Sequence, residues 1–406
     1  MKCRGCDSEV SNVFVDLGES PIANNLISAK NEKIHNISYP LKVFVCDLCL
    51  LVQLPTLFTE SEMFKEDYTY LSSYSQSWLE HCKFFVTEVL NTLEFEKNDL
   101  VIEIASNDGY LLQYFLNKNI EVLGIEPTRS AAKYALDKNI PTIIEFFGTE
   151  LAHTLRKKNI LPRLIIANNV LAHVPNIVDF IEGLSVLATE DTLITIEFPT
   201  VYNLIKNNQF DTIYHEHYSY LSISALLPIL NKFFLSIVNL EKITTHGGSF
   251  RLYLKKNSKN VKNCSIELIL KEELTLDPRD KSVQGDFLGK IQHVKNDLVN
   301  ELNFLKSKGM VIAAYGAAAK GNTLLNYCGI DSTKISYVVD RNPIKQGKKL
   351  PGSLIPIHSE QFLEVNPPDV VLILPWNLSS EIISQLDWLK NNGTKFIRAI
   401  PQLEYL

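Results

Sequence analysis

The chain is predicted to be an α/β protein with two Rossmann-type units and an N-terminal cysteine module. The units are predicted by one pattern that occurs twice, near residues 99–126 and near residues 311–340: a buried strand, a tight turn, a helix, and a second strand ending in an acid. The module is predicted by two C-x2-C pairs close to the N-terminus. We expect three parts, at residues 1–70, 71–256 and 257–406.

The bulk composition limits the class of protein. A chain of 406 residues exceeds one ordinary domain, and 46% hydrophobic with 21% charged residues is typical of a globular protein. A net charge of −6 without any basic block argues against nucleic acid as a partner. The sequence shows no apolar targeting segment and no stretch that would span a bilayer. We therefore expect a cytoplasmic protein without membrane association, either a monomer or a weak oligomer.

The cysteines of the two pairs have the spacing of a metal site. The pairs consist of Cys3, Cys6, Cys46 and Cys49. Four thiolates form a closed tetrahedral zinc site, which is structural because no coordination position remains for a water molecule. Unligated thiols are the alternative. The other cysteines, Cys82, Cys264 and Cys328, are expected to be ordinary thiols.

The first Rossmann-type unit has a turn that suits one class of cofactor. A strand at residues 99–105 is followed by a turn at 106–109, a helix at 110–117 and a strand at 121–125 that ends in Glu126. The turn lacks G-x-G-x-x-G, so it offers a pyrophosphate no glycine cradle, whereas the acid suits two ribose hydroxyls. S-adenosylmethionine (SAM) has a ribose and no phosphate, and it fits better. An α/β domain that binds nothing is the alternative.

Further strands extend this unit and supply the remaining cofactor candidates. A strand at residues 143–147 is expected to turn its terminal aromatics towards the adenine. A strand at 163–167 leads into the loop at 168–174, which we expect beside the methyl group. The expected SAM-binding residues are Glu103, Asn107, Asp108, Gly109, Glu126, Phe146 and Asn168.

A polar aromatic run follows the next buried strand, at residues 192–196. Residues 214–218 read YHEHY, with two imidazoles, a carboxylate and two phenols. Such groups are costly to bury without partners, and ligands of open α/β sheets lie beyond the carboxyl ends of the strands. The alternatives are a surface loop rich in His and Tyr, or an HxH metal pair. Under the catalytic interpretation His173, Tyr214, Glu216 and His217 converge on one cleft.

Two other segments carry ligand candidates. Tyr68 and Tyr70 belong to a polar aromatic strip before a helix at residues 77–93, and this strip either contacts a sugar or nucleotide or packs the zinc module. At residues 245–253 two glycines lie next to His246, Ser249 and Arg251. These glycines let a ligand approach the backbone, and the arginine suits a phosphate; a tight hairpin with a surface arginine is the alternative.

The second unit follows a polar connector. Residues 262–308 are expected to form a solvated helix pair. A strand at 311–315 then leads into a small-residue turn at 316–321, where amides at the helix N-terminus and Lys320 would meet phosphates. The next strand is expected at 337–340. Strands near residues 370–374 and 395–400 complete the sheet.

Assembled in this order, the motifs resemble those of bacterial sugar C-methyltransferases that act on nucleotide-linked keto-deoxysugars. The resemblance covers essentially the whole chain. It rests on the cysteine pairs, the YTY strip, IASNDG, NNVLAH, YHEH, HGGS and GAAAKG.

The resemblance implies SAM-dependent methylation of carbon. The expected substrate is a dTDP-linked 4-keto-6-deoxy sugar, methylated at C3 through an enolate for a branched deoxysugar. It implies that His217 is the base, that Glu216 orients its neighbours, and that Tyr214 and His173 donate to the enolate oxygen. The expected substrate-binding residues are Tyr68, Tyr70, His246, Ser249, Arg251 and Lys320. The rival functions are an O- or N-methyltransferase and a non-catalytic module that binds SAM or a nucleotide-sugar.

Overall fold

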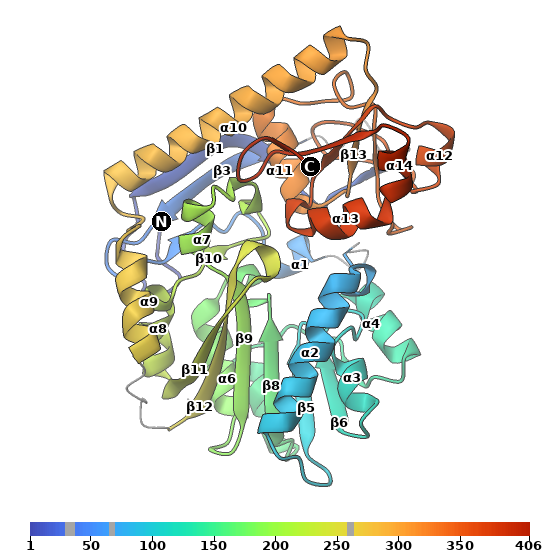
Figure 1. Ribbon diagram of the computed structural model, residues 1–406. Helices are drawn as coiled ribbons and strands as arrows, with labels where there is room; N and C mark the ends of the chain where they lie inside the picture. Colours follow the sequence, from blue (N-terminus) through green and yellow to red (C-terminus); the bar gives the residue numbers. More distant parts are fainter. Residues whose placement is uncertain (29–36, 65–69, 258–263) are drawn as a thin grey trace. The chain divides into compact units, whose positions relative to one another are not determined.

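The computed structural model describes residues 1–28, 37–64, 70–257 and 264–406 (Figure 1). The described chain forms two compact units that each draw on several segments. The first unit comprises Met1–Asn12, Phe44–Tyr202 and Tyr218–Arg279, and the second comprises Val13–Val43, Asn203–His217 and Asp280–Leu406. The division into three parts at residues 70 and 256 stays a prediction.

The first unit is built on a seven-stranded sheet of order β11-β12-β9-β8-β5-β6-β7. Its strands are β5 (Leu100–Ile104), β6 (Glu121–Ile125), β7 (Thr142–Ile143), β8 (Pro162–Asn168), β9 (Leu193–Pro199), β11 (Leu235–Ile243) and β12 (Ser249–Lys256). Strands β5 to β9 run parallel, and β12 pairs antiparallel with both β9 and β11. From β5 the chain moves outwards through β6 and β7, then returns to β8 on the other side. The order therefore reverses between β5 and β8, where ligands of such sheets bind.

Helices cover this sheet and create a hydrophobic core on each face. The helices of the first unit are α1 (Glu60–Met63), α2 (Gln76–Thr92), α3 (Leu112–Leu116), α4 (Arg129–Asp137), α5 (Thr149–Lys157), α6 (Ile177–Leu187), α8 (Ile223–Lys232) and α9 (Cys264–Leu274). Side chains alternate along a strand, so Val101 of β5 joins the core under α2 and α3, whereas Ile102 and Ile104 join the core under α5, α6 and α8 (Figure 1). The prediction of a Rossmann-type unit is confirmed.

The short edge strand β7 corrects one expectation. The predicted strand at residues 143–147 ends at Ile143. Strand β7 is an edge strand that pairs with β6, and the last residue of β6, Ile125, pairs with Ile143. Among the described residues the backbone beyond Ile143 therefore has no strand to pair with, and Phe146 lies in the following loop with 38% of its surface exposed.

The cysteine-rich part of the first unit contains a small antiparallel set of strands. The last residues of β3 (Ser38–Val45) pair with β4 (Val52–Gln53), and β4 pairs with β10 (Ser219–Tyr220). Strand β10 directly follows the YHEHY run. The backbone of Leu54 also donates to the carbonyl of Tyr218 at 3.0 Å. The segment after the YHEHY run is thus part of the sheet that carries the cysteines.

The second unit contains a six-stranded sheet of order β16-β14-β13-β17-β18-β19, parallel except for β19. Its strands are β13 (Ile312–Tyr315), β14 (Tyr337–Val339), β16 (Ile357–His358), β17 (Val370–Ile373), β18 (Lys395–Arg398) and β19 (Glu404–Tyr405). Its helices are α10 (Lys281–Ser307), α11 (Ala319–Cys328), α12 (Phe362–Val365), α13 (Ser379–Gln385) and α14 (Asp387–Asn391). The unit also holds β1 (Val13–Pro21) beside β3, and the pair β2 (Ile27–Ser28) and β15 (Lys348–Lys349). The predicted second Rossmann-like unit is confirmed.

The helical connector is amphipathic rather than solvated on all sides. It forms α9 and α10, as the prediction of a helix pair requires. Helix α10 buries an apolar stripe with helical spacing that includes Phe287, Ile291, Val294 and Leu298. The Phe287 ring stacks on Phe14 of β1 with centroids 5.4 Å apart. Short helix α7 (Val201–Lys206) joins the two units along the chain.

No helix in the described ranges is long and apolar enough to cross a membrane.

The turn after β5 generates a stability prediction. Gly109 has φ +74°, and an added Cβ would lie 2.5 Å from Ile140 Cδ1. We expect Gly109→Ala to lower the free energy of unfolding by about 1–3 kcal/mol, because it combines backbone strain with overpacking. Urea denaturation measures this. Ala105 also has a positive φ, of 56°, so Ala105→Gly is the matched control and should change stability by less than about 1 kcal/mol. Equal losses in both variants would contradict this account.

Candidate active site

The four cysteines of the two C-x2-C pairs form one cluster in the first unit. Their Sγ atoms all lie within 4.8 Å of one another. The Sγ atoms of Cys3 and Cys49 are 3.5 Å apart, and those of Cys6 and Cys46 are 3.6 Å apart. Tetrahedral zinc with Zn–S bonds of about 2.3 Å separates its sulfur ligands by about 3.8 Å. The cluster therefore has the chemistry and the dimensions of the predicted structural zinc site.

Neighbouring side chains support these thiolates. Gln53 of β4 donates through Nε2 to Cys3 Sγ at 3.2 Å, and its Oε1 accepts from the backbone of Arg4 at 3.0 Å. Ser8 Oγ lies 3.1 Å from Cys6 Sγ and 3.2 Å from Cys46 Sγ. Such contacts orient metal ligands and stabilise their charge.

The loop after β5 takes a conformation that usually requires glycine. Ala105, Asn107 and Gly109 all have positive φ values, of 56°, 48° and 74°. The alternation of left-handed residues bends the backbone tightly over the end of β5 although only one of the three is glycine. Asparagine tolerates this conformation well, whereas Ala105 is strained. The missing glycines therefore changed the sequence pattern but not the shape of the turn.

Glu126 closes the loop from the end of β6. Its Oε2 accepts from the Asn107 backbone at 3.0 Å, and its Oε1 accepts from the Thr128 backbone at 2.8 Å and from Thr128 Oγ1 at 2.5 Å. Burial raises the pKa of Glu126 against these hydrogen bonds. The carboxylate thus lies at the carboxyl end of β6, where the prediction places a ribose.

Buried polar atoms without partners gather around the switch point between β5 and β8. The Ser106 hydroxyl, Asp108 Oδ1 and both amide atoms of Asn168 have no hydrogen-bond partner among the described residues. The Glu103 carboxyl beside them is fully buried and interacts with the Tyr110 hydroxyl and the Leu112 backbone. Burial, together with the carboxylates of Asp108 and Glu126, raises the pKa of Glu103 well above its usual value. Unsatisfied buried groups are rare in proteins and mark places for a polar ligand. SAM, with an ammonium, a sulfonium and ribose hydroxyls, fits this donor and acceptor set.

The tyrosine strip is attached to the same loop. Asn107 Oδ1 accepts from the Ser72 backbone at 2.9 Å, and its Nδ2 donates to the Tyr70 carbonyl at 3.2 Å. Asp108 Oδ2 accepts from the Ser73 backbone at 3.3 Å. The side chain of Asn107 therefore holds the strip, and Tyr70 is 43% exposed beside it. Tyr68 lies outside the described residues.

The YHEHY run places a histidine between two defined partners. His217 Nδ1 lies 2.8 Å from the Thr212 carbonyl oxygen, and His217 Nε2 lies 2.8 Å from the Tyr214 hydroxyl. A carbonyl oxygen only accepts, so Nδ1 carries a proton, and in the neutral form of the ring the lone pair lies on Nε2, facing Tyr214. The Tyr214 and His217 rings lie close together, with centroids 4.0 Å apart. This arrangement prepares a proton acceptor.

His215 and Glu216, which lie between Tyr214 and His217 in the chain, are buried in the second unit. His215 is 5% exposed and contacts the Pro40 carbonyl through Nε2 at 3.3 Å, and Glu216 is 1% exposed. Glu216 accepts from Asn24, with 2.5 Å between Oε2 and Nδ2. The surface-loop alternative is therefore wrong. The His217 ring nitrogens face protein partners, and the metal-ligand groups found among the described residues consist of the cysteine cluster alone, so the HxH pair has no support.

His173 belongs to the first unit, whereas Tyr214, Glu216 and His217 belong to the second. It ends the single turn Leu171–His173 after β8, and its ring packs edge-on against Phe64 with centroids 5.8 Å apart. The convergence of all four residues stays a prediction.

The hairpin of β11 and β12 holds a buried ion-pair network. Arg251 is 3% exposed and donates through Nε to Glu197 Oε1 at 2.6 Å and through Nη1 to Glu241 Oε2 at 3.0 Å. His81 Nε2 lies 3.1 Å from Glu197 Oε2. The alternative of a surface arginine is wrong, and Arg251 already has carboxylate partners. A role for Arg251 in substrate binding stays a prediction.

Sequence reasoning missed Glu197 and His81. The signal for Glu197 was a charge inside the apolar strand β9, which requires a cation partner, and β12 supplies Arg251 directly opposite it. His246 and Ser249 lie at the same hairpin. His246 packs edge-on against Trp78 with centroids 4.9 Å apart, and Ser249 Oγ donates to the Thr245 carbonyl at 3.0 Å.

Lys320 lies in the first turn of α11 in the second unit. Its Nζ donates to Asn377 Oδ1 at 2.7 Å and lies 4.8 Å from the centre of the Trp376 ring. Burial lowers the pKa of Lys320, and the charge of Asp211 opposes this. In the turn before α11, Asp340 Oδ2 accepts from the Ala317 backbone at 2.8 Å. This contact corresponds to the hydrogen bond between Glu126 and the Asn107 backbone in the first unit.

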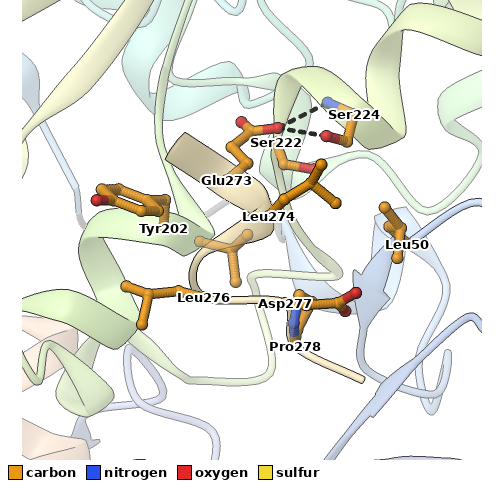
Figure 2. A pocket seen from close by; sticks show the side chains of 10 residues that line it. Leu50, Tyr202, Ser222, Ser224, Glu273, Leu274, Leu276, Asp277 and Pro278 are labelled. Atoms are coloured by element: carbon orange, nitrogen blue, oxygen red, sulfur yellow. Dashed lines mark hydrogen bonds between the residues drawn. The ribbon is translucent and has the colours of Figure 1, made fainter. Parts of the chain in front are cut away.

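A small hollow of ≈ 330 Å³ lies elsewhere in the first unit. Apolar side chains such as Leu50, Leu274 and Leu276 line much of it, and Figure 2 shows Glu273 turned towards Ser224 at its wall. The Glu273 carboxylate accepts from the backbones of Ile223 and Ser224 and so caps α8. None of the predicted site residues lines this hollow.

The fold and the buried polar groups define a Rossmann-type methyltransferase with a zinc-binding module. Residues 3–64 match a zinc-binding domain family, and residues 244–401 match the family described as C-methyltransferase C-terminal domain. The chain is 31% identical over 402 residues to the C-methyltransferase NovU of Streptomyces niveus, covering 99% of this chain and 96% of the relative. The chain therefore belongs to the C-methyltransferase family, and the predicted family and enzyme class are confirmed.

Solved structures of SAM-dependent methyltransferases are similar at lower identity. One from Anabaena variabilis is 14% identical with a TM-score of 0.36, covering 43% of this chain and 84% of its own. One from Archaeoglobus fulgidus is 15% identical with a TM-score of 0.35, covering 44% of this chain and 94% of its own. At TM-scores this low, the two similarities support no conclusion about this chain.

The cysteine cluster generates a metal prediction. We expect about one zinc ion per chain, and Cys49→Ser should lose most of it, because one of four thiolate ligands is removed. Metal analysis after gel filtration measures the zinc content, and thermal unfolding should occur at a lower temperature in the variant. Cys328→Ala, a buried cysteine outside the cluster, should keep its zinc. Zinc retained in full by Cys49→Ser would contradict the assignment.

Glu216 generates a pH prediction. Burial raises its pKa from 4.5 to about 7, although the Asn24 hydrogen bonds and the Lys345 charge act against the rise. Between these values the folded state holds a proton that the unfolded chain releases, so stability falls as pH rises through this window. In Glu216→Gln that fall should shrink by on the order of 2 kcal/mol.

Urea denaturation at about pH 5 and about pH 8 measures this difference. The control is Glu364→Gln, an exposed glutamate of the same unit, which should keep the wild-type slope. A wild-type slope in Glu216→Gln as well would contradict the prediction.

Proposed function

We propose that the protein is a SAM-dependent C-methyltransferase that methylates a dTDP-linked 4-keto-6-deoxy sugar at C3, next to the ketone. The product would enter the synthesis of a branched deoxysugar. The observation that carries the proposal is the hydrogen bond from His217 Nδ1 to the Thr212 carbonyl, because it makes Nε2 a proton acceptor. Membership of the C-methyltransferase family supports it.

Methylation of carbon requires a carbanion, and the proton beside a ketone is the accessible one. His217 Nε2 takes this proton, and the electrons of the C–H bond move into the enolate. The enolate carbon then attacks the methyl group, and the C–S bond breaks with its electrons going to sulfur. Bound SAM would supply the electrophilic methyl group, with S-adenosylhomocysteine as the second product.

Tyr214 has a defined part in this proposal. Its hydroxyl lies 2.8 Å from His217 Nε2, so it occupies the lone pair that must receive the substrate proton. When the substrate enters, the hydroxyl turns to the ketone oxygen and stabilises the enolate as an oxyanion donor does. Glu216 and His173 are proposed as further groups around the reacting atoms. The buried Glu216 carboxyl, with a pKa of about 7, is also able to donate a proton at neutral pH.

The cofactor is proposed to lie at the switch point of the first unit. Glu126 suits the ribose hydroxyls, and the backbone at Asn107, Asp108 and Gly109 forms the tight turn beside them. The buried Glu103 carboxyl and the Asn168 amide, whose atoms lack partners among the described residues, suit the amino-acid end. Phe146, 38% exposed, is proposed to cover the adenine.

The residues proposed to bind the sugar nucleotide are the six that the sequence predicts. They are Tyr68, Tyr70, His246, Ser249, Arg251 and Lys320. Tyr70 is exposed beside the cofactor loop, which supports this role. The zinc is proposed to be structural, because four thiolates leave no open coordination position.

A base substitution tests the chemistry. We expect His217→Ala to lose methyl transfer by on the order of 100-fold or more, because general-base catalysis contributes this much. Mass spectrometry of products formed from SAM and dTDP-4-keto-6-deoxyglucose measures the transfer. Exchange of the proton next to the ketone with heavy water should disappear in the same variant. An O- or N-methyltransferase would show methylation without any exchange, and SAM binding without turnover on keto sugars would favour a binding module.

A further inference from the structure

The segment before the proposed base is held by contacts within the second unit. Asn208 donates through Nδ2 to the carbonyl oxygens of Lys290 at 3.2 Å and Pro401 at 3.3 Å. Phe210 is fully buried and packs edge-on against Tyr327, with ring centroids 5.3 Å apart. These contacts fix the start of the turn Phe210–Thr212 on elements far away in the sequence.

A buried hydrogen bond holds the middle of this turn. Trp376 donates from its indole Nε1 to Asp211 Oδ2 at 2.7 Å. Asp211 is 0% exposed and Trp376 8%. The other oxygen of Asp211 has no hydrogen-bond partner in the described part of the chain. Trp376 therefore orients this carboxyl together with the backbone amides of Asp211 and Thr212, and such a bond is strong because no water competes with it.

A second hydrogen bond holds the residue on the other side of Thr212. Thr323 of α11 donates from Oγ1 to the Ile213 carbonyl oxygen at 3.0 Å, and Thr323 is 2% exposed. Asp211 and Ile213 flank Thr212, so the side chain on one side of it is bonded to the turn Trp376–Leu378 and the carbonyl on the other side to α11. The Thr212 carbonyl is left pointing at His217 Nδ1, 2.8 Å away.

We propose that Asp211, Trp376 and Thr323 are positioning residues that hold the Thr212 carbonyl and thereby select the Nδ1–H tautomer and the orientation of His217. The inference rests on the proposed function for its effect on catalysis. Its structural part, the control of the tautomer, does not depend on the substrate.

The physical reason lies in the two tautomers of a neutral imidazole. A fixed carbonyl oxygen at Nδ1 favours the form with the proton there, which leaves Nε2 free to accept. If the turn moves, the ring can exchange its proton between the nitrogens or rotate. An error of about 1 Å in the place of a catalytic group costs on the order of 100-fold in rate.

The experiment compares substitutions that remove or keep the Trp376–Asp211 hydrogen bond. Trp376→Phe removes the indole donor and keeps an aromatic ring, and Asp211→Leu removes the acceptor. Asp211→Asn keeps an oxygen acceptor; burial raises the pKa of Asp211 to about 7, so the neutral amide is a close substitute at neutral pH. Trp388→Phe is the matched control, because Trp388 is exposed on α14 of the same unit.

Nitrogen-15 NMR of histidine-labelled full-length protein reads the tautomer of His217, with His217→Ala identifying its signals. We expect the Nδ1–H form in wild type, Asp211→Asn and Trp388→Phe. A mixed or reversed tautomer is expected in Trp376→Phe and Asp211→Leu. With dTDP-4-keto-6-deoxyglucose as the probe, kcat should fall on the order of 100-fold in Trp376→Phe and Asp211→Leu, with SAM affinity nearly unchanged. Asp211→Asn should restore most of kcat.

Separate outcomes overturn the inference and the proposed function. An unchanged His217 tautomer in both Trp376→Phe and Asp211→Leu overturns the inference, whatever the activity. Full methyl transfer by His217→Ala overturns the proposed function and leaves the tautomer measurement valid. If both variants fail to fold, Thr323→Val removes only a hydroxyl and must still shift the tautomer; an unchanged tautomer there overturns the inference.

Discussion

The parallel pairing of β5 with both β6 and β8 is the constraint on which the cofactor end of the structure depends. Ile104 pairs with Ile125 on one side, and Glu103 pairs with Ile166 on the other. Because the strands run in the same direction, the groups that follow them lie at the same edge of the sheet. The loop at 105–109, Glu126 and Asn168 come together for this reason, although more than forty residues of chain separate Glu126 from Asn168.

The two units have the same hydrogen bond between an acid and a turn, but the side chains around that turn differ. In each, the acid after the second strand accepts from a backbone amide of the first turn, through Glu126 and Asn107 in one and Asp340 and Ala317 in the other. In the first unit, buried polar atoms around the turn lack hydrogen-bond partners among the described residues. In the second, Lys345 donates to the Ala317 carbonyl and lies 3.4 Å from Asp340, whereas both amide atoms of the buried Asn322 lack partners in the described part of the chain. Each turn therefore has buried polar atoms beside it that the described side chains do not satisfy.

The His217 imidazole in the YHEHY run is held by local contacts, and the strand that follows the run pairs with a distant part of the chain. The contacts of His217 with Tyr214 and Thr212 are local, spanning three and five residues. The run leads directly into β10, which pairs with β4 of the cysteine-rich sheet. Gln53 of β4 in turn donates to Cys3. A zinc-bound knuckle thus supports the strand that continues from the run, which gives the metal a structural purpose.

The sequence by itself determined the fold class, the cysteine cluster, the strands that end in an acid and the histidine run. Each of these is encoded by hydrophobic periodicity or by residues close together in the chain. It misjudged features that depend on neighbours distant in the chain. The strand predicted at residues 143–147 stops at Ile143, where its only partner ends. Arg251 reads locally as a hairpin arginine, yet it is buried because β12 lies against Glu197 of β9.

Only the tertiary structure decided how the proposed base is oriented. Asp211 and Trp376 are 165 residues apart in the chain, and nothing in either local pattern indicates that they meet. The positive φ of Ala105 is likewise not indicated by its residue type, because alanine rarely adopts this conformation. Local sequence encodes which groups are present and the elements that carry them. Hydrogen-bond partners of buried groups come from whichever strand or helix packs alongside, so they are decided only when the chain has folded.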